Sequence, residues 1–137
     1  MRLFVDSSGW IALSATGDKF YEVASRNFGA IRDEPLKLVT SDYVLDESLT
    51  NVQRHFGHRG AVEFGSWVLG NDRVEVARVD EDIWEAAWEM FQAYEDKEWS
   101  FTDCTSFVLM QRRQLYLAFS FDHHFKQAGF QLWPTLS

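Results

Sequence analysis

With 137 residues, 46% of them hydrophobic and 16% aromatic, the chain is long enough to bury one core and too short for two ordinary domains. Its net charge of −8 argues against binding nucleic acid through a broad basic surface, because such a surface needs many lysines and arginines to neutralise phosphates. The lone Cys104 excludes an intramolecular disulfide and a zinc site built from cysteines. We expect a single domain over residues 1–137.

The N-terminal residues bear on location. The acid at Asp6 interrupts any apolar core of a signal peptide, and no later stretch is apolar over the length that a bilayer crossing needs. We therefore expect a cytoplasmic protein without a membrane segment.

Short β-rich runs alternate with amphipathic helical stretches, a pattern typical of an α/β fold with a mainly parallel central sheet flanked by helices. The expected strands cover residues 2–5, 36–40, 73–79, 116–121 and 130–133, and the third of them is expected nearer an edge. After a turn at residues 7–9, a short helix is expected from about residue 10. The later helices are expected over residues 18–33, 42–56, 59–69, 81–94, 101–113 and 123–128. The boundaries rest on capping and helix-breaking residues, namely Pro35, Ser41 or Asp42, Gly57, Asp80, Ser100 or Thr102, and Gly129.

Two acids directly follow hydrophobic strands. Asp6 comes after the first strand, and Asp122 comes after the strand that ends at Phe121. In open α/β sheets, functional sites form just beyond the carboxyl ends of the parallel strands. Each acid alone could simply cap the next helix, but two such acids favour a shared site.

Two further acids lie on predicted helices. Asp103 falls in the first turn of its helix, where the helix dipole favours a carboxylate, yet its neighbours are apolar and an acid among them needs a partner. Glu47 lies about 200° around its helix from Leu45, roughly opposite the apolar stripe of that helix. An ordinary solvated face would explain Glu47 as well, and Asp46 is its local competitor.

Four gathered carboxylates would repel one another, and without a counter-ion at least one would take up a proton. Hard divalent cations with oxygen ligands relieve that repulsion. A metal pair can polarise a scissile phosphate and lower the pKa of an attacking water, so that no catalytic histidine or cysteine is needed.

Four motifs together resemble the PIN-domain family, and within it the VapC toxins of bacterial and archaeal toxin–antitoxin pairs. They are Val5 to Ser8 after the first strand, Val44 to Thr50 on a helix, Ser100 to Phe107 on a later helix, and Phe119 to Phe125 near the end. The resemblance covers residues 2–133 in the expected order and spacing.

The resemblance implies a ribonuclease dependent on Mg²⁺ or Mn²⁺, with Asp6, Glu47, Asp103 and Asp122 as catalytic metal ligands. Hydrolysis of RNA by metal-activated water would leave a 5′-phosphate and a 3′-hydroxyl. The resemblance also implies a homodimer and, in the toxin branch, a small antitoxin protein that blocks the site. Supporting roles are expected for two hydroxyl residues near the acids, Ser8 and Thr102. Some family members carry a further acid two residues after the last one, where this chain has His124.

Other readings of the function stay open. A PIN ribonuclease could act in RNA processing without an antitoxin, and a catalytically silent PIN module could serve only in binding, although all four acids are present. A metal-dependent phosphatase that uses a strand-end Asp as nucleophile usually has a second Asp two residues later. Here Ser7 and Ser8 follow Asp6 instead.

Several other residues are candidates for a functional role. Two histidine pairs, His123 with His124 and His55 with His58, have poor spacing for a zinc site. We expect surface or capping roles for all four histidines. A small buried thiol is expected for Cys104 rather than a nucleophile. Arg112 and Arg113 end a helix, where the helix dipole favours cations. We expect this interaction for them rather than contact with phosphate. Trp84, Trp88 and Phe91 add a second apolar side to their helix, which indicates a dimer or antitoxin surface as well as core.

Overall fold

The central sheet is parallel throughout. The computed structural model describes residues 1–14 and 36–133, so the predicted helix over residues 18–33 lies outside the described residues. The strand order is β3-β2-β1-β4-β5, and every neighbouring pair is parallel. The strands are β1 (Arg2–Val5), β2 (Lys37–Ser41), β3 (Val74–Ala77), β4 (Leu117–Phe119) and β5 (Gln131–Trp133). The predicted α/β class is confirmed, and β3 is at an edge as expected.

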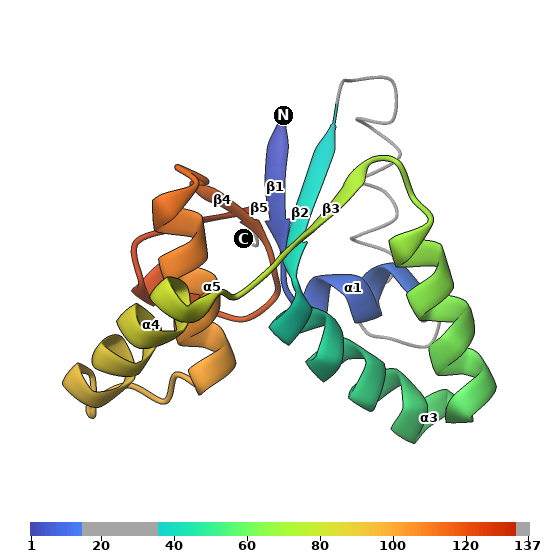
Figure 1. Cartoon of the computed structure of the whole chain (residues 1–137), viewed down its shortest axis with the longest axis horizontal. Coiled ribbons are helices and arrows are strands. Elements are labelled where there is room, and N and C mark those ends of the chain that lie inside the picture. The colour runs from blue at the N-terminus through green and yellow to red at the C-terminus, as the bar shows by residue number, and fades with distance from the viewer. Residues whose placement is uncertain (15–35, 134–137) are drawn as a thin grey trace.

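Helices cover both faces of this sheet. In Figure 1, α1 and α3 lie on one side of the strands, and α4 and α5 lie on the other. Their bounds are α1 (Ser7–Ser14), α3 (Asp42–Leu69), α4 (Glu81–Ala93), α5 (Phe101–Arg112) and α6 (His124–Gln127). Among the described residues, α1 packs on α3 on one face, and α4 packs on α5 on the other.

Side-chain caps determine where the helices begin. Ser41, Asp80 and Ser100 each accept a hydrogen bond from the backbone N–H three residues later, at the starts of α3, α4 and α5. Of the paired alternatives, Ser41 rather than Asp42 and Ser100 rather than Thr102 is therefore the cap. The expected turn over residues 7–9 was wrong: these residues form the first turn of α1, because the carboxylate of Asp6 accepts from Gly9 N and begins the helix early.

The long helix α3 is bent at Gly57, where φ is 77° and ψ is −179°. A positive φ favours glycine, so the predicted helix end at Gly57 corresponds to this kink. The sequence places Leu45, Leu49, Val52 and Phe56 on one apolar stripe of this helix. Leu45 and Val52 are buried, but Phe56 is 59% exposed because it lies beside the kink, where it lines a shallow pocket. No helix in the described part of the chain has both the length and the apolar character needed to cross a membrane.

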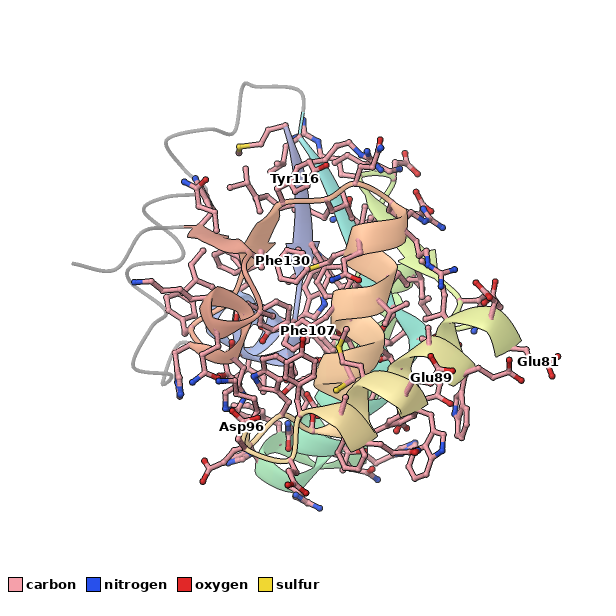
Figure 2. The ribbon with its side chains drawn as sticks, turned by 90° about the vertical axis from the view of Figure 1, so that its left-hand side faces the viewer. Glu81, Glu89, Asp96, Phe107, Tyr116 and Phe130 are labelled. Carbon is pink, nitrogen blue, oxygen red and sulfur yellow. The ribbon has the colours of Figure 1, made fainter. Side chains whose placement is uncertain are left out.

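Aromatic rings fill the space between the sheet and α5. Phe107 meets Phe125 edge-on at 5.0 Å between ring centroids and Phe130 at 5.8 Å. Phe125 reaches on to Phe4 of β1 at 6.2 Å. Figure 2 looks at α5 and α4 from outside this layer, with Phe107 and Phe130 labelled. This packing links β1, α5 and α6, and three of the four predicted acids, Asp6, Asp103 and Asp122, lie in or beside these elements.

Candidate metal centre

The strand order reverses direction between β1 and β4. From β1 the chain proceeds through β2 to β3 on one side, and β4 and β5 then pair on the other side. Such a switch point is where α/β sheets form ligand sites, at the carboxyl ends of the strands. Val5 pairs with Phe119, so the residues that follow, Asp6 on one strand and Ser120 on the other, leave the sheet side by side.

Asp6 is buried, with 7% of its surface exposed, and it is held entirely by hydrogen-bond donors. Its Oδ1 accepts from Ser8 Oγ at 2.8 Å and from Gly9 N at 3.1 Å, while its Oδ2 accepts from Ser120 Oγ at 2.8 Å. Burial raises the pKa of Asp6 to about 7, the three donors oppose that rise, and the charge of Asp122 adds to it. The three donors thus stabilise the ionised carboxylate of Asp6, whereas burial alone would favour its protonated form.

Asp122 lies where the chain passes from β4 to α6. Its backbone N–H donates to Ser120 Oγ at 3.0 Å, and its Oδ1 accepts from the backbone N–H of His124 at 3.0 Å. Its charge acts on the pKa values of both Asp6 and Asp103. Asp122 is therefore electrostatically close to two acids that come from separate parts of the chain.

Asp103 has two roles at the start of α5. Its Oδ2 accepts from the backbone N–H of Ser100 at 3.0 Å and completes a capping box, a local role in addition to the dipole interaction expected for an acid in the first turn. The same oxygen lies 3.0 Å from His124 Nδ1. Burial is the first cause that raises the pKa of Asp103, and the charge of Asp122 raises it further.

Glu47 is partly buried, whereas Asp46 is exposed. Ser7 Oγ, at the first position of α1, donates to Glu47 Oε1. Because Ser7 directly follows Asp6, this hydrogen bond ties Glu47 to the end of β1 and favours Glu47 over Asp46 as the helix-borne acid.

His124 is the residue that sequence reasoning placed least well. Its side chain is 17% exposed and lies between two carboxylates, 3.0 Å from Asp103 Oδ2 and 3.2 Å from Asp122 Oδ1. His123 is exposed, as expected. Ligand atoms of Asp122, His123 and His124 lie within 4.8 Å of one another, so this group could also contribute to holding a cation.

The hydroxyl residues near the acids have different positions. Ser8 contacts Asp6, as its predicted supporting role requires. The backbone carbonyl of Thr102 accepts a hydrogen bond from the hydroxyl of Thr105 at 2.7 Å, which is a contact within α5. Ser120 and Ser7 were not predicted, because their contacts depend on strand register and on the early start of α1.

The remaining candidates have local partners. Cys104 is fully buried and burial raises the pKa of its thiol to about 11, which confirms a buried thiol and opposes a nucleophile. Arg112 pairs with Asp82 and Arg113 with Glu75. His55 Nδ1 lies 2.9 Å from the carbonyl of Asn51 on an exposed surface.

The donor set suits a hard divalent cation. Carboxylate oxygens are the ligands that Mg²⁺ and Mn²⁺ prefer. Oδ2 of Asp6 accepts one hydrogen bond and retains a lone pair for a cation, whereas Oδ1 already accepts two. A cation would also offset the desolvation and the like-charge repulsion that raise the pKa values of Asp6 and Asp103.

A parallel sheet with acids at its switch point is an arrangement found in nucleases that use metal ions. The chain belongs to the PIN-domain family, since the PIN domain model matches residues 3–131. It is 38% identical over 128 residues to the 23S rRNA-specific endonuclease VapC20 of Mycobacterium tuberculosis. The aligned residues cover 93% of this chain and 95% of that relative. The suspected resemblance to PIN domains and VapC proteins is thereby confirmed.

Solved structures agree with this assignment. The crystal structure of M. tuberculosis VapC20, described as a toxin that cleaves the sarcin–ricin loop, matches with a TM-score of 0.85 at 38% identity, over 93% of this chain and 95% of that one. VapBC2 from Rickettsia felis, solved with a DNA fragment from its promoter, matches with a TM-score of 0.71 over 96% of this chain and 97% of that one. At 11% identity the second match shows the fold alone.

Proposed function

We propose that this chain is an endoribonuclease dependent on Mg²⁺ or Mn²⁺, and the toxin of a VapBC-type toxin–antitoxin pair. The observation that carries the proposal is the placement of Asp122, whose charge acts on both Asp6 and Asp103 at the end of β1 and the start of α5. Buried acids that also repel one another at a sheet switch point are stabilised as carboxylates by a bound cation. The similarity to VapC20 over almost the whole chain supports the same reading.

Asp6, Glu47, Asp103 and Asp122 are the proposed metal ligands. When bound, the cation would polarise the scissile phosphate and lower the pKa of an attacking water. Asp6 is the rigid member, because donors hold both of its oxygens. Glu47 is steadied by Ser7, and Asp103 is steadied by the capping box. His124 Nδ1 lies against both Asp103 and Asp122 and bridges their carboxylates.

The proposed substrate is RNA, cut by hydrolysis to leave a 5′-phosphate and a 3′-hydroxyl. Because VapC20 is named for 23S rRNA and for the sarcin–ricin loop, that loop is the first candidate substrate here. The acidic chain has few cations with which to hold phosphates, so recognition would depend on bound metal and on the shape of a folded RNA.

Two partners are proposed, a small antitoxin and a second copy of this chain. The candidate dimer surface is the aromatic face of α4, where Trp84, Trp88 and Phe91 are 40%, 46% and 41% exposed. Trp88 stacks on both of the others, and Phe101 packs edge-on against all three. Stacked, half-exposed aromatic side chains are typical of interface cores. Acids such as Glu81 and Glu89 lie along the same helix (Figure 2) and would form a polar rim.

The proposed activity is tested with a synthetic sarcin–ricin-loop hairpin and a control hairpin of scrambled sequence. Cleavage is expected with Mg²⁺ or Mn²⁺ and is expected to stop with EDTA. Asp6→Asn, Glu47→Gln, Asp103→Asn and Asp122→Asn should each reduce it to background. Asp46→Asn, which alters the exposed neighbour of Glu47, is the matched control and should retain activity. Activity that survives EDTA, or all four ligand variants at full activity, would contradict the proposal.

The partner proposals have separate tests. Trp84→Glu combined with Trp88→Glu should convert a dimer to a monomer in light scattering. Tyr116→Glu, at a 68% exposed aromatic side chain outside the aromatic face of α4, should leave the dimer intact. Purification from the native cell should yield a small bound protein. Its absence would favour the alternative of a PIN ribonuclease in RNA processing, and inactivity on every RNA would favour a silent binding module.

A further inference from the structure

Two serine hydroxyls connect the ends of β1 and β4. Ser8 Oγ donates to Asp6 Oδ1 at 2.8 Å and accepts from the backbone N–H of Phe121 at 2.9 Å. Ser120 Oγ donates to Asp6 Oδ2 at 2.8 Å and accepts from the backbone N–H of Asp122 at 3.0 Å. The two hydroxyl oxygens are 3.4 Å apart. Each hydroxyl therefore gives its single proton to Asp6 and takes one backbone proton from the chain after β4.

We propose that Ser120 is a positioning residue that holds the carboxylate of Asp6 in register with Asp122, so that the two acids face one cation. The inference rests on the proposed metal-dependent function. Ser120 precedes Asp122 by two residues but contacts the acid 114 positions earlier in the sequence. One side chain thus fixes the orientation of the first acid and the backbone of the last.

Burial is the reason why this contact matters. Ser120 is fully buried and Asp6 is nearly so. A buried acceptor or donor that loses its partner keeps the whole cost of desolvation, because water does not replace the lost hydrogen bond. Removing the hydroxyl leaves Asp6 Oδ2 and Asp122 N without this partner at once. The carboxylate then either rotates or takes up a proton, and both outcomes weaken a cation site.

Removing the Ser120 hydroxyl is expected to lower metal affinity more than it lowers global stability. Hydrogen bonds that orient metal ligands from outside the coordination sphere typically change metal affinity by about 10-fold to 100-fold when removed. A serine that served only in packing would leave that affinity unchanged once the protein is folded. Metal affinity at matched foldedness therefore distinguishes the two roles.

The test measures Mn²⁺ affinity by calorimetry for Ser120→Ala and Ser120→Cys. The cysteine variant keeps the side-chain size but has only a weak donor. Both should bind Mn²⁺ about 10-fold or more weakly than the wild type. Ser120→Thr, which keeps the hydroxyl, should retain an affinity within about twofold of the wild type. Ser106→Ala is the matched control, because Ser106 is a buried serine whose hydroxyl has no hydrogen-bond partner among the described residues. Wild-type affinity in both Ser120→Ala and Ser120→Cys would overturn the proposal.

A second measurement separates this inference from the proposed function. In EDTA, unfolding by urea is compared for Ser120→Ala, Asp6→Ala and the double variant. If Ser120 orients Asp6, the two changes are expected to be non-additive, because each removes the same hydrogen bond. Additive effects would overturn the positioning role even if Mn²⁺ binds. Failure of the wild type to bind Mn²⁺ would instead overturn the proposed function, and the cycle would still test the contact.

Discussion

In metal-free solution, raising the pH from 4 to 8 is expected to destabilise the protein through Asp6. Burial raises the pKa of this carboxyl from 3.8 to about 7 in the folded chain. Between those values the folded state binds a proton that the unfolded state has released, so the free energy of unfolding falls as the pH rises. Below the unfolded pKa both states are protonated and the effect is absent. Above the folded pKa it is fully present.

The size of the effect follows from the two pKa values. Each pKa unit corresponds to about 1.4 kcal/mol, so a rise of this size costs on the order of 4 kcal/mol above neutral pH. That is a large share of the stability of an ordinary domain, about 5–15 kcal/mol. Asp6→Asn is neutral at every pH and nearly the same size, so it should match the wild type near pH 4 and exceed it near pH 8. A saturating divalent cation should reverse the order near pH 8, because it binds the wild-type site.

The assay is urea unfolding in EDTA, followed by tryptophan fluorescence, at pH values between 4 and 8. The quantity of interest is the difference in unfolding free energy between the wild type and Asp6→Asn, since other titrating groups largely cancel in it. Asp46→Asn, at an exposed acid, should show no such divergence. A difference that stays constant over the whole range would refute the idea that burial opposes ionisation of Asp6.

Three further outcomes are expected. Gly9→Ala should destabilise the fold by about 1–3 kcal/mol or more in urea unfolding, because a Cβ there would lie 2.5 Å from the ring and the carbonyl oxygen of Phe119; an unchanged midpoint would contradict this close contact. The thiol of Cys104 should react with a disulfide reagent only after unfolding, and Cys104→Ala should keep RNA cleavage, since the thiol is buried with a raised pKa; rapid reaction of the native protein at pH 8 would oppose this. Asp80→Ala should cost about 1 kcal/mol by removing the bond from Ile83 N at the start of α4, whereas Glu89→Gln on the same helix should be neutral in thermal unfolding.

Hydrophobic runs and capping residues in the sequence were enough to predict the order of strands and helices over the described residues. The position of Asp6 and Asp122 after buried strands led to a shared site because parallel strands end at one edge of a sheet. Their electrostatic interaction in the structure agrees with that reasoning. The choice of Glu47 over Asp46 came from the resemblance, since helical geometry left both open, and partial burial and the contact with Ser7 favour it.

The contacts that sequence reasoning missed depend on tertiary register. Ser120 reaches Asp6 only because Val5 pairs with Phe119, and the sequence does not state which residues of β1 and β4 are opposite. The side chain of His124 is enclosed by Asp103 and Asp122 only after α5 and α6 pack together. The start of α1 was placed late because the capping role of Asp6 depends on its side-chain rotamer.

The distribution of the proposed ligands along the chain has a consequence for protein synthesis. Asp6 follows β1, the first strand, whereas Asp122 follows β4, the fourth. A translation product that stops before β4 lacks Asp122 and Ser120, and it also lacks the strand that pairs with the other side of β1. The proposed ligand set, and any cleavage that depends on it, would therefore be assembled only after β4 has been synthesised and has paired with β1.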